Sequence, residues 1–175
     1  MAMATFQLAK QKRTAIDHIA YALATGLGAG FAPIAPGTVG SLEGVVIFVA
    51  VLALHFGTST SLLVLAVLNV VIFGVGVWAA TRTCEITGRK DPRLIVIDEV
   101  SGQLIALTPL AFLPALSITG LIAGFLLFRL FDIFKPYPIR KLERLHAGLG
   151  VVADDVLAGL YAAALLWVGH LARLI

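Results

Sequence analysis

Long apolar segments alternate with short polar ones along almost the whole chain. A membrane-spanning helix needs about 20 mostly apolar residues. The first apolar segment reaches that length only if its helix begins near Gly37. We therefore expect an all-α fold, a polytopic membrane helix bundle with about five transmembrane helices. The candidate spans cover residues 41–56, 60–80, 94–113, 116–134 and 151–171.

A sixth apolar segment, residues 16–31, precedes these spans. It is rich in alanine and glycine, and Pro33 and Pro36 interrupt the chain just after it. Non-helical backbone at membrane depth is tolerated only inside protein or beside a wet cavity. We therefore expect an N-terminal interfacial or re-entrant helix rather than a full crossing.

The amino-acid composition supports a membrane location. Hydrophobic residues make up 59% of the 175 residues and charged residues 13%, against about 25% charged residues in a typical soluble domain. So few charges cannot cover the surface of a soluble domain, and the excess apolar surface must face lipid. The single cysteine excludes an intramolecular disulfide framework. We expect one integral membrane domain over residues 1–175 and no nucleic-acid partner.

Basic residues occur in alternate connections between the spans. They precede the first span, separate the second from the third, and separate the fourth from the fifth, whereas the connections near residues 57–59 and 114–115 carry no charge. The positive-inside rule then places residues 1–15 and the two other basic segments in the cytoplasm. These residues are Lys10, Lys12 and Arg13, then Arg82, Arg89, Lys90 and Arg93, then Lys135, Arg140, Lys141 and Arg144.

Acidic residues inside the spans gather towards this same face. Asp98 and Glu99 open the third span, Asp132 lies near the end of the fourth, and Asp154 and Asp155 open the fifth. At about 1.5 Å per residue, each lies within roughly 10 Å of one membrane surface. Five carboxylates cannot all stay ionised in a small, partly dry volume. We predict a Mg²⁺ site, because Mg²⁺ takes oxygen ligands. Intramembrane salt bridges are the alternative, and the helix dipole explains part of the acidic pair at the start of the fifth span.

Two basic residues beside these acids indicate a phosphate ligand. Arg129 lies one helical turn before Asp132, and Lys135 follows at the end of the same span. An arginine offers a bidentate fork to phosphate, and a lysine offers a mobile point charge. Arg129 could instead pair with Asp132.

A loop rich in glycine, residues 30–41, is a second candidate phosphate contact. Gly37 and Gly40 would let the backbone approach a ligand closely. Thr38 or Ser41 would cap the following helix, whose N-terminal N–H groups then form an anion site. An ordinary turn followed by a helix cap explains the same pattern equally well.

Two further titratable residues have no assigned place in the cluster. His146 lies in the last basic connection, where it could donate a proton, although a loop histidine is more often simply solvated. Glu43 lies in the first span and either lines the same cavity or reaches to the interface.

These motifs resemble those of the phosphatidylglycerophosphatase A family of bacterial inner-membrane enzymes. The resemblance implies hydrolysis of the lipid substrate phosphatidylglycerophosphate to phosphatidylglycerol, dependence on Mg²⁺, and a multi-pass protein whose active site faces the cytoplasm. Glu43 is not part of the family motif. The resemblance runs from about Gly26 to about residue 170, and its most specific stretches are residues 36–41, 98–99, 128–139 and 146–155.

On this interpretation one or two Mg²⁺ ions are held by four acids, namely Asp98, Glu99, Asp154 and Asp155. Asp132 is a further ligand or the base for the attacking water. Arg129 and Lys135 neutralise the phosphoryl group. Direct attack by water and a carboxylate nucleophile both remain open. Another lipid-phosphate or headgroup enzyme is the first alternative function, and a cation- or proton-coupled transporter with its site at the bilayer midplane is the second.

Overall fold

The computed structural model describes residues 13–113 and 115–174, which form helices without a strand among them. The all-α prediction is therefore confirmed. The predicted cytoplasmic residues before Arg13 lie outside the described part of the chain. The helices are α2 (Ala15–Ala24), η1 (Gly26–Phe31), α3 (Pro36–Ala53), α4 (Thr58–Thr87), α5 (Ile97–Leu107), η2 (Thr108–Phe112), α6 (Ile118–Phe134), α7 (Ile139–Leu142) and α8 (Ala147–Leu171).

Three helices are long and apolar enough to cross a membrane, namely α3, α4 and α8, with 18, 30 and 25 residues. The helix α6 has 17 residues, and α5 has only 11 before the chain tightens into the 3₁₀ turn η2. A full crossing needs about 17–25 residues, so α6 lies at the lower limit of that range and α5 is too short. The structure thus supports three spans by length and composition, and the count of about five remains a prediction.

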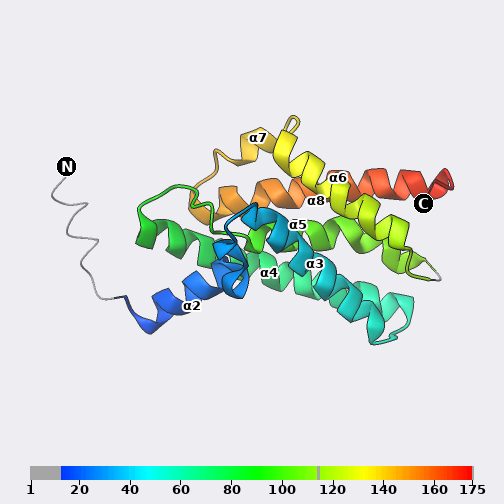
Figure 1. Cartoon of the computed structure of the whole chain (residues 1–175), viewed down its shortest axis with the longest axis horizontal. Coiled ribbons are helices and arrows are strands. Elements are labelled where there is room, and N and C mark those ends of the chain that lie inside the picture. The colour runs from blue at the N-terminus through cyan, green and yellow to red at the C-terminus, as the bar shows by residue number, and fades with distance from the viewer. Residues whose placement is uncertain (1–12, 114, 175) are drawn as a thin grey trace.

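The helix α5 lies in the middle of the bundle (Figure 1), in contact with α3, α4, α6 and α8. Nine of its 11 residues are buried. Figure 1 also shows α3, α5 and α8 running away from the end of the bundle at which α2 lies, while α4 and α6 run back towards it. The first turn of α5 and the last turn of α6 therefore lie at the same end.

The contact between α5 and α8 is close enough for the two backbones to touch. A Cβ added at Gly159 of α8 would lie 3.0 Å from the carbonyl carbon of Gly102 in α5, and one added at Gly102 would lie 2.6 Å from the carbonyl oxygen of Asp155. Small residues allow this approach between helices in a membrane. The contact sets the acidic first turn of α5 directly beside Asp155.

The segment predicted as interfacial or re-entrant consists of α2 followed by irregular backbone. A capping box between Thr14 and Asp17 starts α2. Leu27 and Gly28 in η1 have positive φ angles of 49° and 122°, so the chain turns sharply there. Asp17 also pairs with Arg82 at 2.6 Å, which fixes α2 against α4.

Candidate active site

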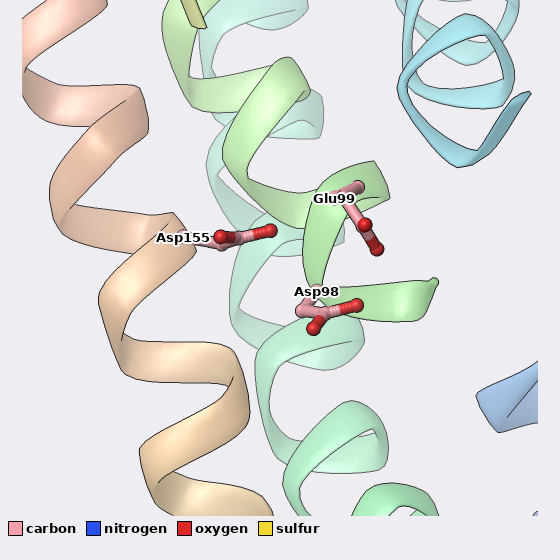
Figure 2. A group of neighbouring side chains, drawn as sticks. All are labelled: Asp98, Glu99 and Asp155. Atoms are coloured by element: carbon pink, nitrogen blue, oxygen red, sulfur yellow. The ribbon is translucent and has the colours of Figure 1, made fainter. Parts of the chain in front are cut away.

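Three carboxylates converge where α5 meets α8. Asp98 and Glu99 lie in the first turn of α5, and Asp155 reaches across from α8 (Figure 2). One oxygen from each side chain lies within 4.8 Å of the other two. Asp98 is 8% exposed and Asp155 3% exposed. This group, Asp98, Glu99 and Asp155, is called the carboxylate cluster below.

Two features of the carboxylate cluster fit a divalent cation: the short distances between its oxygens, and the buried oxygens that have no hydrogen-bond donor. Among the described residues, Oδ1 of Asp98 and Oε2 of Glu99 are buried without a hydrogen-bond partner. A buried polar atom without a partner costs about 1–3 kcal/mol, and more when it is charged. Adjacent carboxylates also repel each other. A hard cation with oxygen ligands would relieve both penalties.

The start of α5 is held in place by the chain before it. The N–H of Val96 donates to the carbonyl oxygen of Ala24 at the end of α2, and the N–H of Ile95 donates to Pro92. Ile95 and Val96 are both buried. The first turn of α5 is thus anchored on α2, and its two acids also face the positive end of the helix dipole.

Arg129 lies beside the carboxylate cluster, on α6. Its Nη1 donates to Oγ of Ser41 at 3.2 Å, forms an ion pair with Oδ2 of Asp132 at 2.8 Å, and lies 3.9 Å from Oε1 of Glu99. Its Nε is buried without a partner among the described residues. The guanidinium is therefore oriented by three helices, with part of its hydrogen-bonding capacity still unused.

Lys135, at the end of α6, lies between two acids outside the carboxylate cluster, Asp154 and Glu143. It adopts a left-handed conformation with φ of 44°, which ends the helix just before Pro136. Its Nζ donates to Oδ2 of Asp154 at 2.5 Å and to Oε1 of Glu143 at 2.8 Å. Burial alone would lower the pKa of Lys135, but the hydrogen bonds to the two carboxylates outweigh it and raise that pKa. Lys135 therefore carries its charge between two acids.

The two neighbouring acids of α8 face different partners. Asp155 joins the carboxylate cluster, whereas Asp154 pairs with Lys135 and accepts the N–H of Asp155 at its Oδ1. Asp154 also borders a cavity of about 230 Å³ whose wall includes the charged residues Lys90 and Glu143. Both acids lie two turns inside α8, which begins at Ala147. The helix dipole therefore does not explain the pair, contrary to the sequence-based interpretation.

The predicted loop at residues 30–41 is wrong over its second half, because α3 begins at Pro36. The residue before the helix is Ala35, without a side-chain cap, and Oγ of Ser41 donates to the carbonyl oxygen of Gly37 inside the helix. Neither Thr38 nor Ser41 caps α3. Proline is well suited to the first position of a helix, and this preference outweighs the loop-forming tendency of the glycines.

The glycines of this segment serve close packing. A Cβ added at Gly37 would lie 3.0 Å from Cδ of Glu99 and 3.2 Å from Nη1 of Arg129, and one added at Gly40 would lie 2.8 Å from the carbonyl oxygen of Val96. Gly37 thus borders the candidate site directly, while Gly40 seats α3 against the start of α5.

The structure places Glu43 and His146 away from the carboxylate cluster. Glu43 lines a separate, mostly apolar cavity of about 500 Å³ together with Gly26 and Val100, so of its two predicted places the shared cavity is excluded. His146 is exposed, immediately before α8, and its side chain does not cap the helix.

Sequence reasoning missed three features of the site. Glu143 shares Lys135 with Asp154, and Gln103, one turn after Glu99, is fully buried with both amide atoms unpaired among the described residues. The glycine contact between α5 and α8 is the third. An intramembrane glutamine was the one available signal, because polar residues inside spans are functional candidates by default.

Comparison with known proteins identifies similar chains along most of this length. A family model described as Phosphatidylglycerophosphatase A matches residues 22–170. A protein of Bacteroides thetaiotaomicron, named as a candidate phosphatidylinositol-3-phosphatase, is 39% identical over 156 residues, which cover 85% of this chain and 91% of that protein.

Two relatives are named phosphatidylglycerophosphatase A. The protein of Haemophilus influenzae is 38% identical over 152 residues, covering 86% of this chain and 88% of its own length. The protein of Escherichia coli is 35% identical over 150 residues, covering 85% and 82%. No solved structure matches this chain.

Proposed function

The chain belongs to the phosphatidylglycerophosphatase A family, a family of phosphatases, and from this premise we propose that it hydrolyses phosphatidylglycerophosphate. In this reaction the oxygen of water bonds to the terminal phosphorus. The bond from that phosphorus to the glycerol oxygen breaks, and the glycerol oxygen takes a proton. The products are phosphatidylglycerol and inorganic phosphate.

One observation carries the proposal for the site. The carboxylate cluster lies next to an arginine that is already oriented: Nη1 of Arg129 is 3.9 Å from Glu99, pairs with Asp132 and donates a hydrogen bond to Ser41. Phosphoryl transfer depends mainly on positioning and on stabilising charge around the phosphate oxygens. A buried cation site beside a fixed guanidinium provides both.

We propose Mg²⁺ as the cation, held by Asp98, Glu99 and Asp155. When bound, it would neutralise the charge that develops on the phosphate oxygens. The unpaired oxygens of Asp98 and Glu99 support this assignment, because Mg²⁺ is commonly bound through one or two carboxylates together with substrate phosphate.

The remaining site residues act on the phosphate and on the proton of the attacking water. Arg129 would bind the phosphoryl oxygens through the guanidinium edge that Asp132 and Ser41 leave unused. Lys135, charged and paired with Asp154 and Glu143 of the cavity wall, would attract the phosphate and steady the departing product. Asp132, one turn from Arg129, would accept the proton of the attacking water.

A carboxylate nucleophile is the second route in this proposal. In that case a carboxylate of the cluster would attack phosphorus, and water would hydrolyse the resulting acyl-phosphate. Denaturing the protein during turnover with lipid labelled on its terminal phosphate separates the routes. Label that stays on the protein supports the carboxylate, and label found only as inorganic phosphate supports water.

We place the reaction at the cytoplasmic face of a bacterial inner membrane. The basic connections at the site's end of the bundle support this orientation. Three apolar helices long enough to cross a membrane support the multi-pass location. A basic surface also attracts anionic lipid headgroups.

Phosphatidylinositol 3-phosphate is the second candidate substrate. The Bacteroides thetaiotaomicron relative, named for that lipid, is as similar to this chain as the two phosphatidylglycerophosphatase relatives. Both lipids present a phosphate monoester on a polyol headgroup, so the same carboxylates and arginine would serve either. Competition between the two lipids in one reaction ranks them by kcat/KM.

Phosphate release by the purified protein in mixed micelles tests the function. We expect release from phosphatidylglycerophosphate with Mg²⁺ present and a loss of at least 10²-fold after chelation. Asp98→Asn and Asp155→Asn should each lower the rate of phosphate release by at least the same factor. Glu85→Gln is the matched control and should keep the native rate, because Glu85 is exposed in the last turn of α4. The proposal fails if the native protein with Mg²⁺ releases phosphate from neither lipid.

A further inference from the structure

A shallow, open apolar groove lies along the exposed face of α6 and includes Arg129 of the candidate site. Its volume is about 580 Å³, and Arg129 is its one charged wall residue. Nη2 of Arg129 makes no hydrogen bond within the described part of the chain, whereas Nη1 pairs with Asp132 and donates to Ser41. The apolar lining residues all belong to α6, and four of them are 47–66% exposed. They are Ala123, Leu126, Leu127, Leu130, Ile133 and Phe134.

The groove has the length of one bilayer leaflet. Its walls run over residues 123–134, which at about 1.5 Å per residue correspond to roughly 16 Å of helix. The hydrocarbon core of a bilayer is about 30 Å thick. Half of that core is about 15 Å. The groove starts at the Lys135 end of α6 and therefore reaches close to the bilayer midplane. An acyl chain has the shape and polarity to fill it.

Arg129 connects this groove to the carboxylate cluster. The same side chain that lines the groove lies 3.9 Å from Glu99, so a ligand in both places must join a phosphate to a long apolar chain. We propose that the groove holds an acyl chain of the phospholipid substrate, which enters sideways from the bilayer along α6. This inference rests on the proposed lipid-phosphatase function.

The groove sets the position of the substrate more than its affinity. A chain that leaves lipid for an apolar groove exchanges one apolar surrounding for another, so the hydrophobic effect contributes little. A filled groove instead fixes the depth of the headgroup relative to Arg129. Since a misplacement of about 1 Å can cost about 10²-fold in rate, blocking the groove should lower kcat/KM rather than abolish binding.

Tryptophan substitutions along α6 test the groove. Leu126→Trp and Leu130→Trp fill it, and Ile122→Trp is the matched control, since Ile122 is 55% exposed on the same helix but does not line the groove. The two substrates are long-chain phosphatidylglycerophosphate and its deacylated, water-soluble headgroup.

For the long-chain lipid, we expect the two groove variants to lower kcat/KM at least tenfold. For the deacylated compound, all variants should stay within about twofold of the native protein, and Ile122→Trp should stay there for both substrates. The inference is overturned if the groove variants match Ile122→Trp on the long-chain lipid, or if they lose both substrates equally.

Photolabelling of the native protein provides a test that does not depend on the variants or on turnover. Phosphatidylglycerophosphate with a diazirine near the end of one acyl chain should label residues 123–134 of α6 above the lipid-facing surface of α4, and excess unlabelled substrate should compete the label away. Equal labelling of α4 and α6 refutes the groove. If the native protein turns over neither substrate but labels α6, the proposed function fails while the lipid site stands.

Discussion

Replacing Gly37 by alanine places a methyl group against the carboxylate of Glu99 while leaving the rest of α3 unchanged. The added Cβ would lie 3.0 Å from Cδ of Glu99 and 3.2 Å from Nη1 of Arg129, and closer still to Oε1 of Glu99. Carbon atoms in ordinary contact are about 3.5–4.0 Å apart. The carboxylate therefore has to withdraw by roughly 1 Å, a displacement that can cost about 10²-fold in rate.

This substitution should separate catalysis from folding. The atoms that the new Cβ meets are the ends of flexible side chains, so they can move without disturbing the backbone. We expect kcat/KM for phosphatidylglycerophosphate to fall about 10²-fold, which corresponds to about 2.7 kcal/mol in the barrier. The free energy of unfolding should change by less than about 1 kcal/mol, because alanine also favours the helix.

Gly74→Ala is the matched control for the assay. A Cβ added at Gly74, inside α4, meets nothing within 4 Å. Phosphate release in mixed micelles and thermal unfolding are measured on both variants. If Gly37→Ala keeps activity within threefold of Gly74→Ala, then Glu99 does not lie where the reaction needs it. If Gly37→Ala unfolds, side-chain movement does not relieve the overlap, and the structural premise is wrong.

Three further substitutions test other parts of the structure. Gly159→Val should lower the free energy of unfolding by about 1–3 kcal/mol, because the added atoms meet the backbone of Gly102; titration with a denaturing detergent measures this. A backbone N–H at the helix cap and the nearby Arg82 lower the pKa of Asp17 to about 2, from 3.8. Ionised Asp17 therefore stabilises the fold above about pH 4, and this stabilisation is lost as the carboxylate is protonated towards pH 2. The native Tm should fall as pH drops from about 4 to about 2, and Asp17→Asn should remove that step. Lys135→Met should reduce kcat/KM by about 10²-fold, as expected for losing one charge-stabilising donor, with Lys135→Arg retaining more activity; kinetics with both variants decide this.

The gathering of charge at one end of the bundle could be predicted from sequence alone. Span length, helical rise and the alternation of basic connections are local rules, and together they put Asp98, Asp132 and Asp155 near one depth. The structure brings their helix ends together as these rules predict. The catalytic and metal-binding roles of these residues remain predictions.

The partner of each acid could not be predicted in the same way. Asp154 and Asp155 are adjacent in sequence, but neighbouring residues on a helix point about 100° apart. One therefore meets α5 and the other meets Lys135. Which of the two faces α5 depends on how α8 is rotated, and that rotation is set by the contact between Gly102 and Gly159.

The start of α3 differs from the loop predicted for the glycine-rich segment. Proline and glycine usually indicate a loop, yet α3 begins at Pro36 and continues through Gly37. The sequence contains no sign that Glu99 and Arg129 press against this turn and leave space only for a hydrogen atom at Gly37. Tertiary packing decided the outcome over local preference.

The backbone contact between α5 and α8 has a mechanical consequence for an enzyme that works in bilayers of changing composition. Lipid-facing helices tilt when the hydrocarbon thickness changes. Because α5 and α8 touch at Gly102 and Gly159, they cannot tilt independently without breaking this backbone contact. The two helices therefore act as one stiff unit that carries Asp98, Glu99 and Asp155, and the spacing of these carboxylates should be the same in thin and thick membranes.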